Sequence, residues 1–109
     1  MEAWGNMKRI LLVEDDRTLS ETLMQHLNQH GYHTTSAYTK DLAVTKIRNV
    51  RFDLILLDIT LPDGTGFAVC ETIRQISTDI RIIFLTAKDM DGDILKGYDM
   101  GAVVYFYIA

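Results

Sequence analysis

The sequence predicts a single α/β domain built on a doubly wound, five-stranded parallel sheet. The chain has 109 residues, a length typical of one domain. Short apolar runs alternate with amphipathic segments along the whole chain, which indicates parallel strands joined by helical crossovers. Hydrophobic residues make up 48% and charged residues 24%. This balance is typical of a globular domain and excludes collagen-like, mucin-like and disordered classes.

The charge balance is acidic, with 15 acidic against 11 basic residues and a net charge of −4. It argues against binding of nucleic acid or of an anionic membrane by this chain alone, because both favour a basic patch. The single cysteine, Cys70, cannot form an internal disulfide. No apolar run approaches the roughly 20 residues of a membrane helix. We therefore expect a cytoplasmic domain over residues 8–109, preceded by a flexible leader over residues 1–7.

The first three elements follow from apolar spacing. The short apolar run Arg9–Val13 is typical of a strand buried on both faces. The next segment carries one leucine every four residues, at Leu19, Leu23 and Leu27. This spacing predicts a helix, which Gly31 is placed to end. Residues 32–37 alternate weakly and are rich in Thr and Tyr, which favours a strand nearer the sheet edge.

The middle of the chain repeats this alternation. A second amphipathic helix is marked by Leu42, Ala43, Ile47 and Val50. The apolar run 54–57 then predicts a strand that ends at Asp58. Residues 61–66 are rich in Pro, Asp and Gly, which predicts a turn-rich loop.

The last part of the chain predicts two further helices and two further strands. The third helix is marked by Phe67, Cys70, Ile73 and Ile76. The run 80–85 predicts a strand, and 91–100 a short helix that Gly101 ends. Residues 102–108 predict the final strand.

Acidic side chains gather where the predicted strands end. Asp15 and Asp16 follow the first strand, and Asp58 follows the third. Ligands of such folds bind outside the carboxyl ends of the strands. If the first and third strands are neighbours, these carboxylates converge. Like charges ~4 Å apart repel by about 4 kcal/mol at an effective dielectric near 20, so the cluster requires protonation, separation or a cation.

Three carboxylates with a loop carbonyl and waters suit Mg²⁺. A metal beside Asp58 can hold a phosphoryl donor in line with that carboxylate, which then attacks phosphorus. Thr86 and the backbone N–H of Ala87 are placed to contact the phosphoryl oxygens. An alternative stays open for Asp16, because an aspartate before a helix is often its N-cap.

Five segments carry a resemblance to a known family: Lys8–Asp16, Phe52–Asp58, Leu61–Gly66, Leu85–Ala87, and Gly101-Ala102 before Tyr105. In order and spacing they resemble the receiver domain of bacterial two-component response regulators. The likeness runs from about residue 8 to residue 105. The Pro-Asp-Gly loop and the Leu-Thr-Ala-Lys segment are most similar to regulators that carry a winged-helix DNA-binding domain.

The resemblance implies a flavodoxin-like receiver fold with strand order 2-1-3-4-5. It implies that Asp58 accepts a phosphoryl group from a sensor histidine kinase. Asp15, Asp16, Asp58 and the backbone carbonyl of Thr60 would hold Mg²⁺. Thr86 would bind the phosphoryl group, and Tyr105 would be the aromatic that switches with it.

The implied protein is a signalling switch rather than an enzyme, with at most self-phosphorylation and self-dephosphorylation at Asp58. Its output, transcription, would lie in a domain absent from this chain, and DNA would be reached only through that domain.

The sequence departs from the family near its end. Ile108 and Ala109 stand where the family has Lys and Pro, and the fifth helix is missing. We therefore expect a receiver that is incomplete at its C-terminus. An uncovered sheet favours association, so we expect self-association through the fourth helix, the fifth strand and the tail, including by exchange of an element.

Two other functions stay open. The first is an Mg²⁺-dependent phosphohydrolase, which also uses an aspartate nucleophile. Enzymes of the haloacid dehalogenase type want a second acid two residues after the nucleophile, where this chain has Thr60. The second is a phosphorylation-independent interaction module, which Ile108 favours.

Overall fold

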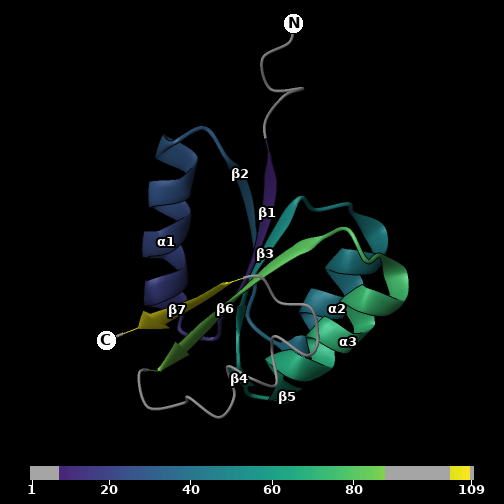
Figure 1. Cartoon of the computed structure of the whole chain (residues 1–109). Helices are drawn as coiled ribbons and strands as arrows, with labels where there is room; N and C mark the ends of the chain where they lie inside the picture. Colours follow the sequence, from purple (N-terminus) through teal and green to yellow (C-terminus); the bar gives the residue numbers. More distant parts are fainter. Residues whose placement is uncertain (1–7, 88–103, 109) are drawn as a thin grey trace, which may run out of the picture.

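The computed structural model describes the backbone of residues 8–87 and 104–108 and the side chains of residues 8–85 (Figure 1). Five strands form one sheet: β1 Arg9–Val13, β2 His33–Ala37, β3 Leu54–Asp58, β6 Arg81–Ala87 and β7 Val104–Ile108. They lie in the order β2-β1-β3-β6-β7, and every pair is parallel. The predicted strand order is therefore confirmed.

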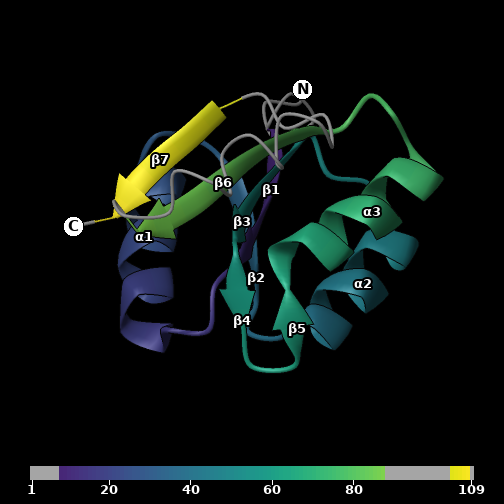
Figure 2. The same cartoon turned by 60° about the horizontal axis from the view of Figure 1, so that its bottom comes forward.

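Helices cover both faces of the sheet, as a doubly wound fold requires. Helix α1, Arg17–Gln29, lies on one face (Figure 2). Helices α2, Lys40–Asn49, and α3, Gly66–Ile76, lie side by side on the other. The predicted helix over residues 91–100 lies outside the described residues, as does the predicted leader. No helix in the described part of the chain is both long and apolar enough to span a membrane.

The main core lies between the sheet and the pair α2 and α3. Strand residues and helix residues both contribute to one buried cluster, which includes Leu11, Val13, Ala43, Ile47, Ile55, Leu57, Val69, Cys70, Ile73, Ile82 and Phe84. The rings of Phe67 and Phe84 pack at 5.2 Å between centroids. Cys70 is fully buried there, as expected of a small core residue.

Several apolar residues that were predicted to face the core are exposed or only half-buried. Leu42 and Ile76 are each 47% exposed, and Val50 caps α2 at 36% exposure. The three leucines of α1 are only half-buried, so Ser20 is the one buried residue of that helix. Gly31 ends α1 as predicted, with a φ of 89° that glycine adopts readily.

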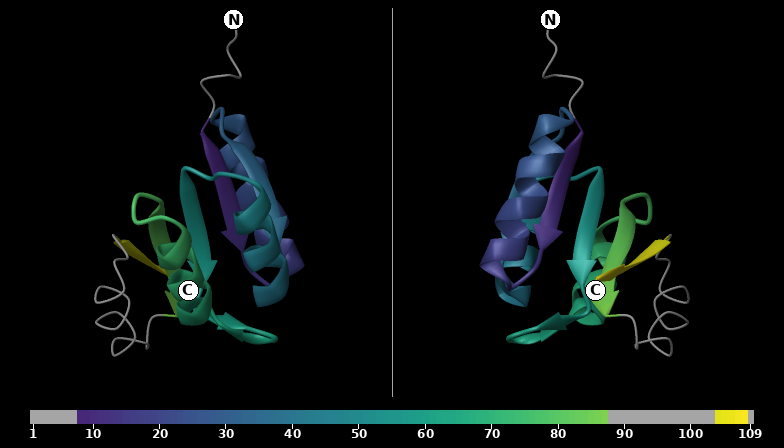
Figure 3. Two further views of the ribbon diagram at one scale, coloured as in Figure 1. Left: turned by 90° about the vertical axis from the view of Figure 1, so that its right-hand side faces the viewer. Right: turned by 90° about the vertical axis from the view of Figure 1, so that its left-hand side faces the viewer.

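The predicted loop over residues 61–66 contains a small hairpin that the sequence did not indicate. Strands β4, Thr60–Leu61, and β5, Gly64–Thr65, pair antiparallel directly after β3. The hairpin projects beyond the carboxyl edge of the main sheet (Figure 3). It therefore lies beside the end of β3, where Asp58 stands.

The predicted self-association stays a prediction. The fourth helix and residue 109 lie outside the described residues. The fifth strand is β7, an outer strand of the described sheet.

Candidate functional site

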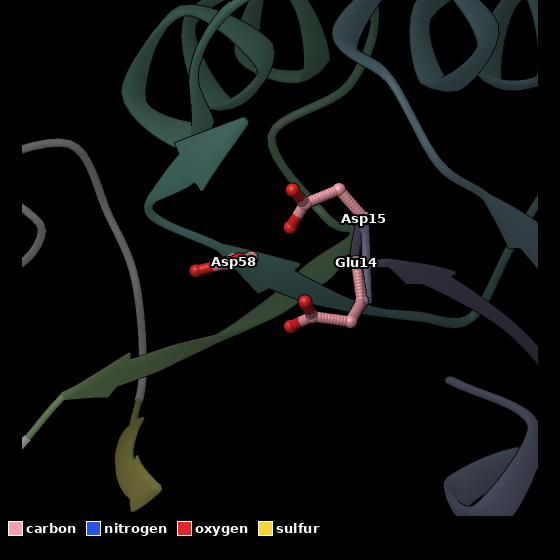
Figure 4. Close-up of side chains that lie close together, drawn as sticks. All are labelled: Glu14, Asp15 and Asp58. Atoms are coloured by element: carbon pink, nitrogen blue, oxygen red, sulfur yellow. The ribbon is translucent and has the colours of Figure 1, made fainter. Parts of the chain in front are cut away.

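Three carboxylates meet at the carboxyl edge of the sheet. Glu14 and Asp15 directly follow β1, and Asp58 is the last residue of β3. Strands β1 and β3 pair with Val13 opposite Leu57, so the following residues of each strand are neighbours. Each of the three side chains offers an oxygen, and these oxygens lie within 4.8 Å of one another (Figure 4). The predicted convergence of Asp15 with Asp58 is therefore present.

The backbone of this site continues the hydrogen bonds of the sheet. The N–H of Glu14 donates to the carbonyl of Ala37 in β2 at 3.1 Å. The N–H of Ile59 donates to the carbonyl of Leu85 in β6 at 3.4 Å. The backbone of Glu14 and the backbone that follows Asp58 are thus held by neighbouring strands. This favours a fixed geometry for the two carboxylates.

Asp16 lies outside this group and caps α1. Its side chain is the N-cap of α1, and its Oδ1 accepts the N–H of Leu19 at 3.0 Å. Its own N–H donates to Oε1 of Glu14 at 3.0 Å. Glu14 therefore lies in the carboxylate group at the place where the sequence analysis expected Asp16. The sequence feature that could have identified Glu14 is its position directly after Val13, the last residue of β1.

The surroundings of Glu14 strongly raise the pKa of its carboxyl group. Glu14 is only 3% exposed. Burial, followed by the charges of Asp58 and Asp15 and a hydrogen bond with Asp15, raises its pKa from 4.5 to about 7, although the N–H of Asp16 opposes the shift. The carboxyl group of Glu14 therefore keeps its proton to a higher pH than a solvent-exposed glutamate does.

The pKa of Asp58 is also raised above 3.8, chiefly by burial and then by the charge of Asp15. Hydrogen bonds from the N–H of Thr60, at 3.3 Å to Oδ1, and with Glu14 oppose that rise. Since burial and like charge prevail for both groups, the described surroundings leave the cluster short of positive charge. Carboxylate oxygens are hard donors of the kind that Mg²⁺ prefers, and the charge of the ion would offset the negative charge of the cluster.

Gly66, the first residue of α3, lies directly against the backbone of Asp58. Its N–H donates to the carbonyl of Ile59 at 2.7 Å. A Cβ at this position would lie 2.2 Å from the carbonyl oxygen of Asp58. Only glycine permits this approach, so α3 begins where it can support the end of β3.

The remaining predicted residues are placed by strand register alone. Asp58 is paired with Leu85, so Thr86 and Ala87 continue β6 beyond the carboxylate. Ala87 in turn pairs with Ile108 of β7. Tyr105 pairs with Phe84, three residues before the edge that Ile108 occupies. The roles of the side chains at 86 and 105 stay predictions.

The raised pKa of Glu14 predicts an unusual dependence of stability on pH. The folded state holds the proton more tightly than the unfolded state, so the free energy of unfolding without Mg²⁺ should fall between pH 4.5 and about 7, by up to about 3 kcal/mol. Added Mg²⁺ should recover stability at pH 8 and do little at pH 5, because protons compete with the ion. Urea unfolding at both pH values, with Mg²⁺ or with a chelator, measures this.

The control is Glu14→Gln, which removes the titration of Glu14 and should make the pH profile shallower. Equal stabilisation by Mg²⁺ at both pH values in the parent would contradict the prediction.

Comparisons with a family model, with curated proteins and with solved structures all point to the same family. The family model described as "Response regulator receiver domain" matches residues 10–107. The chain is 37% identical over 97 residues to the transcriptional regulatory protein DltR of Streptococcus agalactiae, which covers 89% of this chain and 43% of that protein. It is 36% identical over 98 residues to the alkaline phosphatase synthesis transcriptional regulatory protein PhoP of Bacillus subtilis, covering 90% of this chain and 41% of that protein.

Solved structures agree with the sequence relatives. The non-phosphorylated HemR receiver domain of Leptospira biflexa is similar with a TM-score of 0.86 and 41% identity, covering 92% of this chain and 81% of that one. A receiver domain protein of Methanospirillum hungatei is similar with a TM-score of 0.89 and 30% identity, covering 94% and 82%. The chain spans less than half the length of the two transcriptional regulatory proteins. Since the family model accounts for residues 10–107, the chain belongs to the response regulator receiver domain family.

Proposed function

We propose that this chain is the phosphoacceptor domain of a two-component response regulator, and that Asp58 takes a phosphoryl group from a sensor histidine kinase. One observation carries the proposal. Asp58 ends a central strand with an oxygen within 4.8 Å of oxygens of Glu14 and Asp15, in a chain of the receiver family. Receiver domains act as signalling modules, so we expect one phosphoryl group per chain rather than turnover of a diffusible substrate.

The proposed reaction is a displacement at phosphorus. A carboxylate oxygen of Asp58 bonds to phosphorus while the bond from phosphorus to the kinase imidazole nitrogen breaks, and that nitrogen keeps the electron pair. With acetyl phosphate as the donor, acetate leaves instead. The product is an acyl phosphate on Asp58, which carries about −1.5 to −2 charges where the free carboxylate carried one.

We propose that Glu14, Asp15, Asp58 and the backbone carbonyl of Thr60 hold Mg²⁺. Asp16 is left out of this revised set because its Oδ1 accepts the N–H of Leu19. Bound Mg²⁺ would supply the positive charge that offsets these carboxylates and the phosphoryl oxygens. Thr86 and the N–H of Ala87 are the proposed phosphoryl contacts, and Tyr105 the proposed switch aromatic.

We propose transcription as the output. The relatives DltR and PhoP are named as transcriptional regulatory proteins. DNA would be bound through a winged-helix output domain rather than through this acidic chain, in the cytoplasm.

Incubation with acetyl phosphate and Mg²⁺, followed by intact-mass measurement, tests the function. We expect one added phosphoryl group, and none when a chelator replaces Mg²⁺. Continuous release of p-nitrophenol from p-nitrophenyl phosphate would instead support the phosphohydrolase. No added phosphoryl group under any condition would support a phosphorylation-independent interaction module.

The interaction module is favoured by Ile108, which pairs with Ala87 where the family has Lys. Ile108→Lys should restore a positive charge at the carboxyl edge of the sheet. A charge pair there contributes about 1 kcal/mol, so we expect the phosphorylated fraction to rise by roughly fivefold at limiting acetyl phosphate. Ile108→Met is the control of similar length. Equal yields from the Lys and Met variants would contradict the prediction.

A further inference from the structure

We infer that Asp63 is a positioning residue of this site, because its carboxylate ties the hairpin formed by β4 and β5 to the first turn of α2 and thereby fixes Thr60 beside Asp58. The inference rests on the proposed function, in which the backbone of Thr60 serves the metal and the phosphoacceptor. Asp63 itself touches neither.

Two hydrogen bonds join Asp63 to α2. Oδ1 accepts the N–H of Lys40 at 2.7 Å, and Oδ2 accepts the N–H of Asp41 at 3.1 Å. These are the first two residues of the helix, whose N–H groups have no partner within the helix itself. The negative carboxylate also suits the positive end of the helix. The pKa of Asp63 is lowered, first by the N–H of Lys40, as expected of a charged acceptor.

The helix cap is thereby shared between two parts of the chain. Thr39, the N-cap of α2, accepts the N–H of Leu42 with its Oγ1 at 3.2 Å. Asp63 supplies the other two acceptors from more than 20 residues away. The contact is therefore a tertiary link, not only a local cap.

The hairpin carries this link to the site. Asp63 lies at its turn, between Leu61 of β4 and Gly64 of β5, which are paired. Thr60 lies at its base and donates its N–H to Oδ1 of Asp58 at 3.3 Å. Figure 3 shows the hairpin projecting past the sheet, and among the described residues β4 and β5 pair only with each other. The anchor at the turn therefore restrains the direction in which the base of the hairpin presents its backbone.

The packing around Gly64 is a second, independent observation that the hairpin lies close against α2. A Cβ on Gly64 would lie 2.9 Å from Cδ of Lys40, so the lysine stem packs directly over the glycine. The same helix residue thus contacts the hairpin by its N–H and by its side chain. Both contacts hold the hairpin on the α2 side.

Loss of this anchor should weaken the site while leaving its carboxylates in place. Residues that orient metal ligands from outside the ligand shell are worth about 10- to 100-fold in metal affinity. Thr60 lies only a few residues from Asp63. Leu61 of the same hairpin is 6% exposed, so its burial would still restrain the hairpin without the Asp63 carboxylate. We therefore expect the lower end of that range for Asp63→Ala.

The test compares Asp63→Ala with Asp53→Ala. Asp53 is a matched control, because its Oδ2 also accepts a backbone N–H, that of Arg9 at 2.8 Å, but before β3, at the opposite end of the sheet from Asp58. Mg²⁺ affinity is measured by calorimetry, stability by urea unfolding, and the protection of the Thr60 amide by hydrogen exchange without metal. We expect Asp63→Ala to weaken Mg²⁺ binding about tenfold and to speed Thr60 exchange about tenfold relative to Asp53→Ala.

A second variant, Asp63→Asn, keeps one acceptor oxygen and should restore part of both effects. If Asp63→Ala leaves Thr60 exchange and Mg²⁺ affinity like those of Asp53→Ala at equal stability, Asp63 is merely a helix cap and the inference is overturned. If the parent chain binds no Mg²⁺ and takes no phosphoryl group, the proposed function fails. The exchange of the Thr60 amide still decides whether Asp63 positions the hairpin.

Discussion

Asp58→Asn should abolish phosphoryl incorporation from acetyl phosphate while the chain stays folded. The amide keeps the size of the side chain and an oxygen that can accept the N–H of Thr60, but it lacks the anionic nucleophile. It also removes one of the charges that raise the pKa of Glu14. We therefore expect the metal-free variant to be more stable than the parent by about 1 kcal/mol at pH 8. Intact mass and urea unfolding measure the two effects.

The matched control is Asp16→Asn, which makes the same chemical change beside the site. Asn is as good an N-cap as Asp, so α1 should persist and phosphoryl incorporation should continue. Loss of incorporation in Asp16→Asn as well would contradict the revised ligand set. Persistent incorporation in Asp58→Asn would place the phosphoacceptor elsewhere.

Gly66→Ala should be the most destabilising single-methyl change in the site. The new Cβ would lie 2.2 Å from the carbonyl oxygen of Asp58 and 3.2 Å from Cα of Ile59, and both neighbours are backbone. Neither can move without shifting the end of β3 or the start of α3. We expect a loss of about 3 kcal/mol in the free energy of unfolding, together with weaker Mg²⁺ binding.

Gly64→Ala separates this effect from the general cost of replacing glycine. There the nearest atom is Cδ of Lys40, 2.9 Å away on a flexible side chain that can turn aside. Its cost should be less than about 1 kcal/mol. Equal losses of stability in the two alanine variants would show that the contact with Asp58 is not the cause.

The sheet could be predicted because its strands are unambiguous in the sequence. Arg9–Val13 forms β1 with the predicted bounds, and the run before Asp58 forms β3. Alternation with helices then leaves few topologies, which brings Asp15 and Asp58 together. The hairpin of β4 and β5 escaped because two-residue strands show no period that apolar spacing can reveal.

The choice between Glu14 and Asp16 depended on a boundary that the sequence leaves open. Three consecutive acids follow Val13, and each is chemically able to bind a metal. Only the start of α1 decides that Asp16 serves as its cap and that Glu14 remains for the cluster. Element ends are set by tertiary contacts, so capping and ligation could not be told apart beforehand.

The helices that follow the two sides of the carboxylate cluster are buried to different extents. Asp58 lies against Gly66 at the start of α3, which has five buried residues, whereas Glu14 and Asp15 lead into α1, which buries only Ser20. Local opening therefore costs less free energy on the α1 side than on the α3 side. An ion bridging these carboxylates would join the strand that leads into α1 to the strand that ends against α3, and α1 would be the first of the two helices to open when the ion leaves.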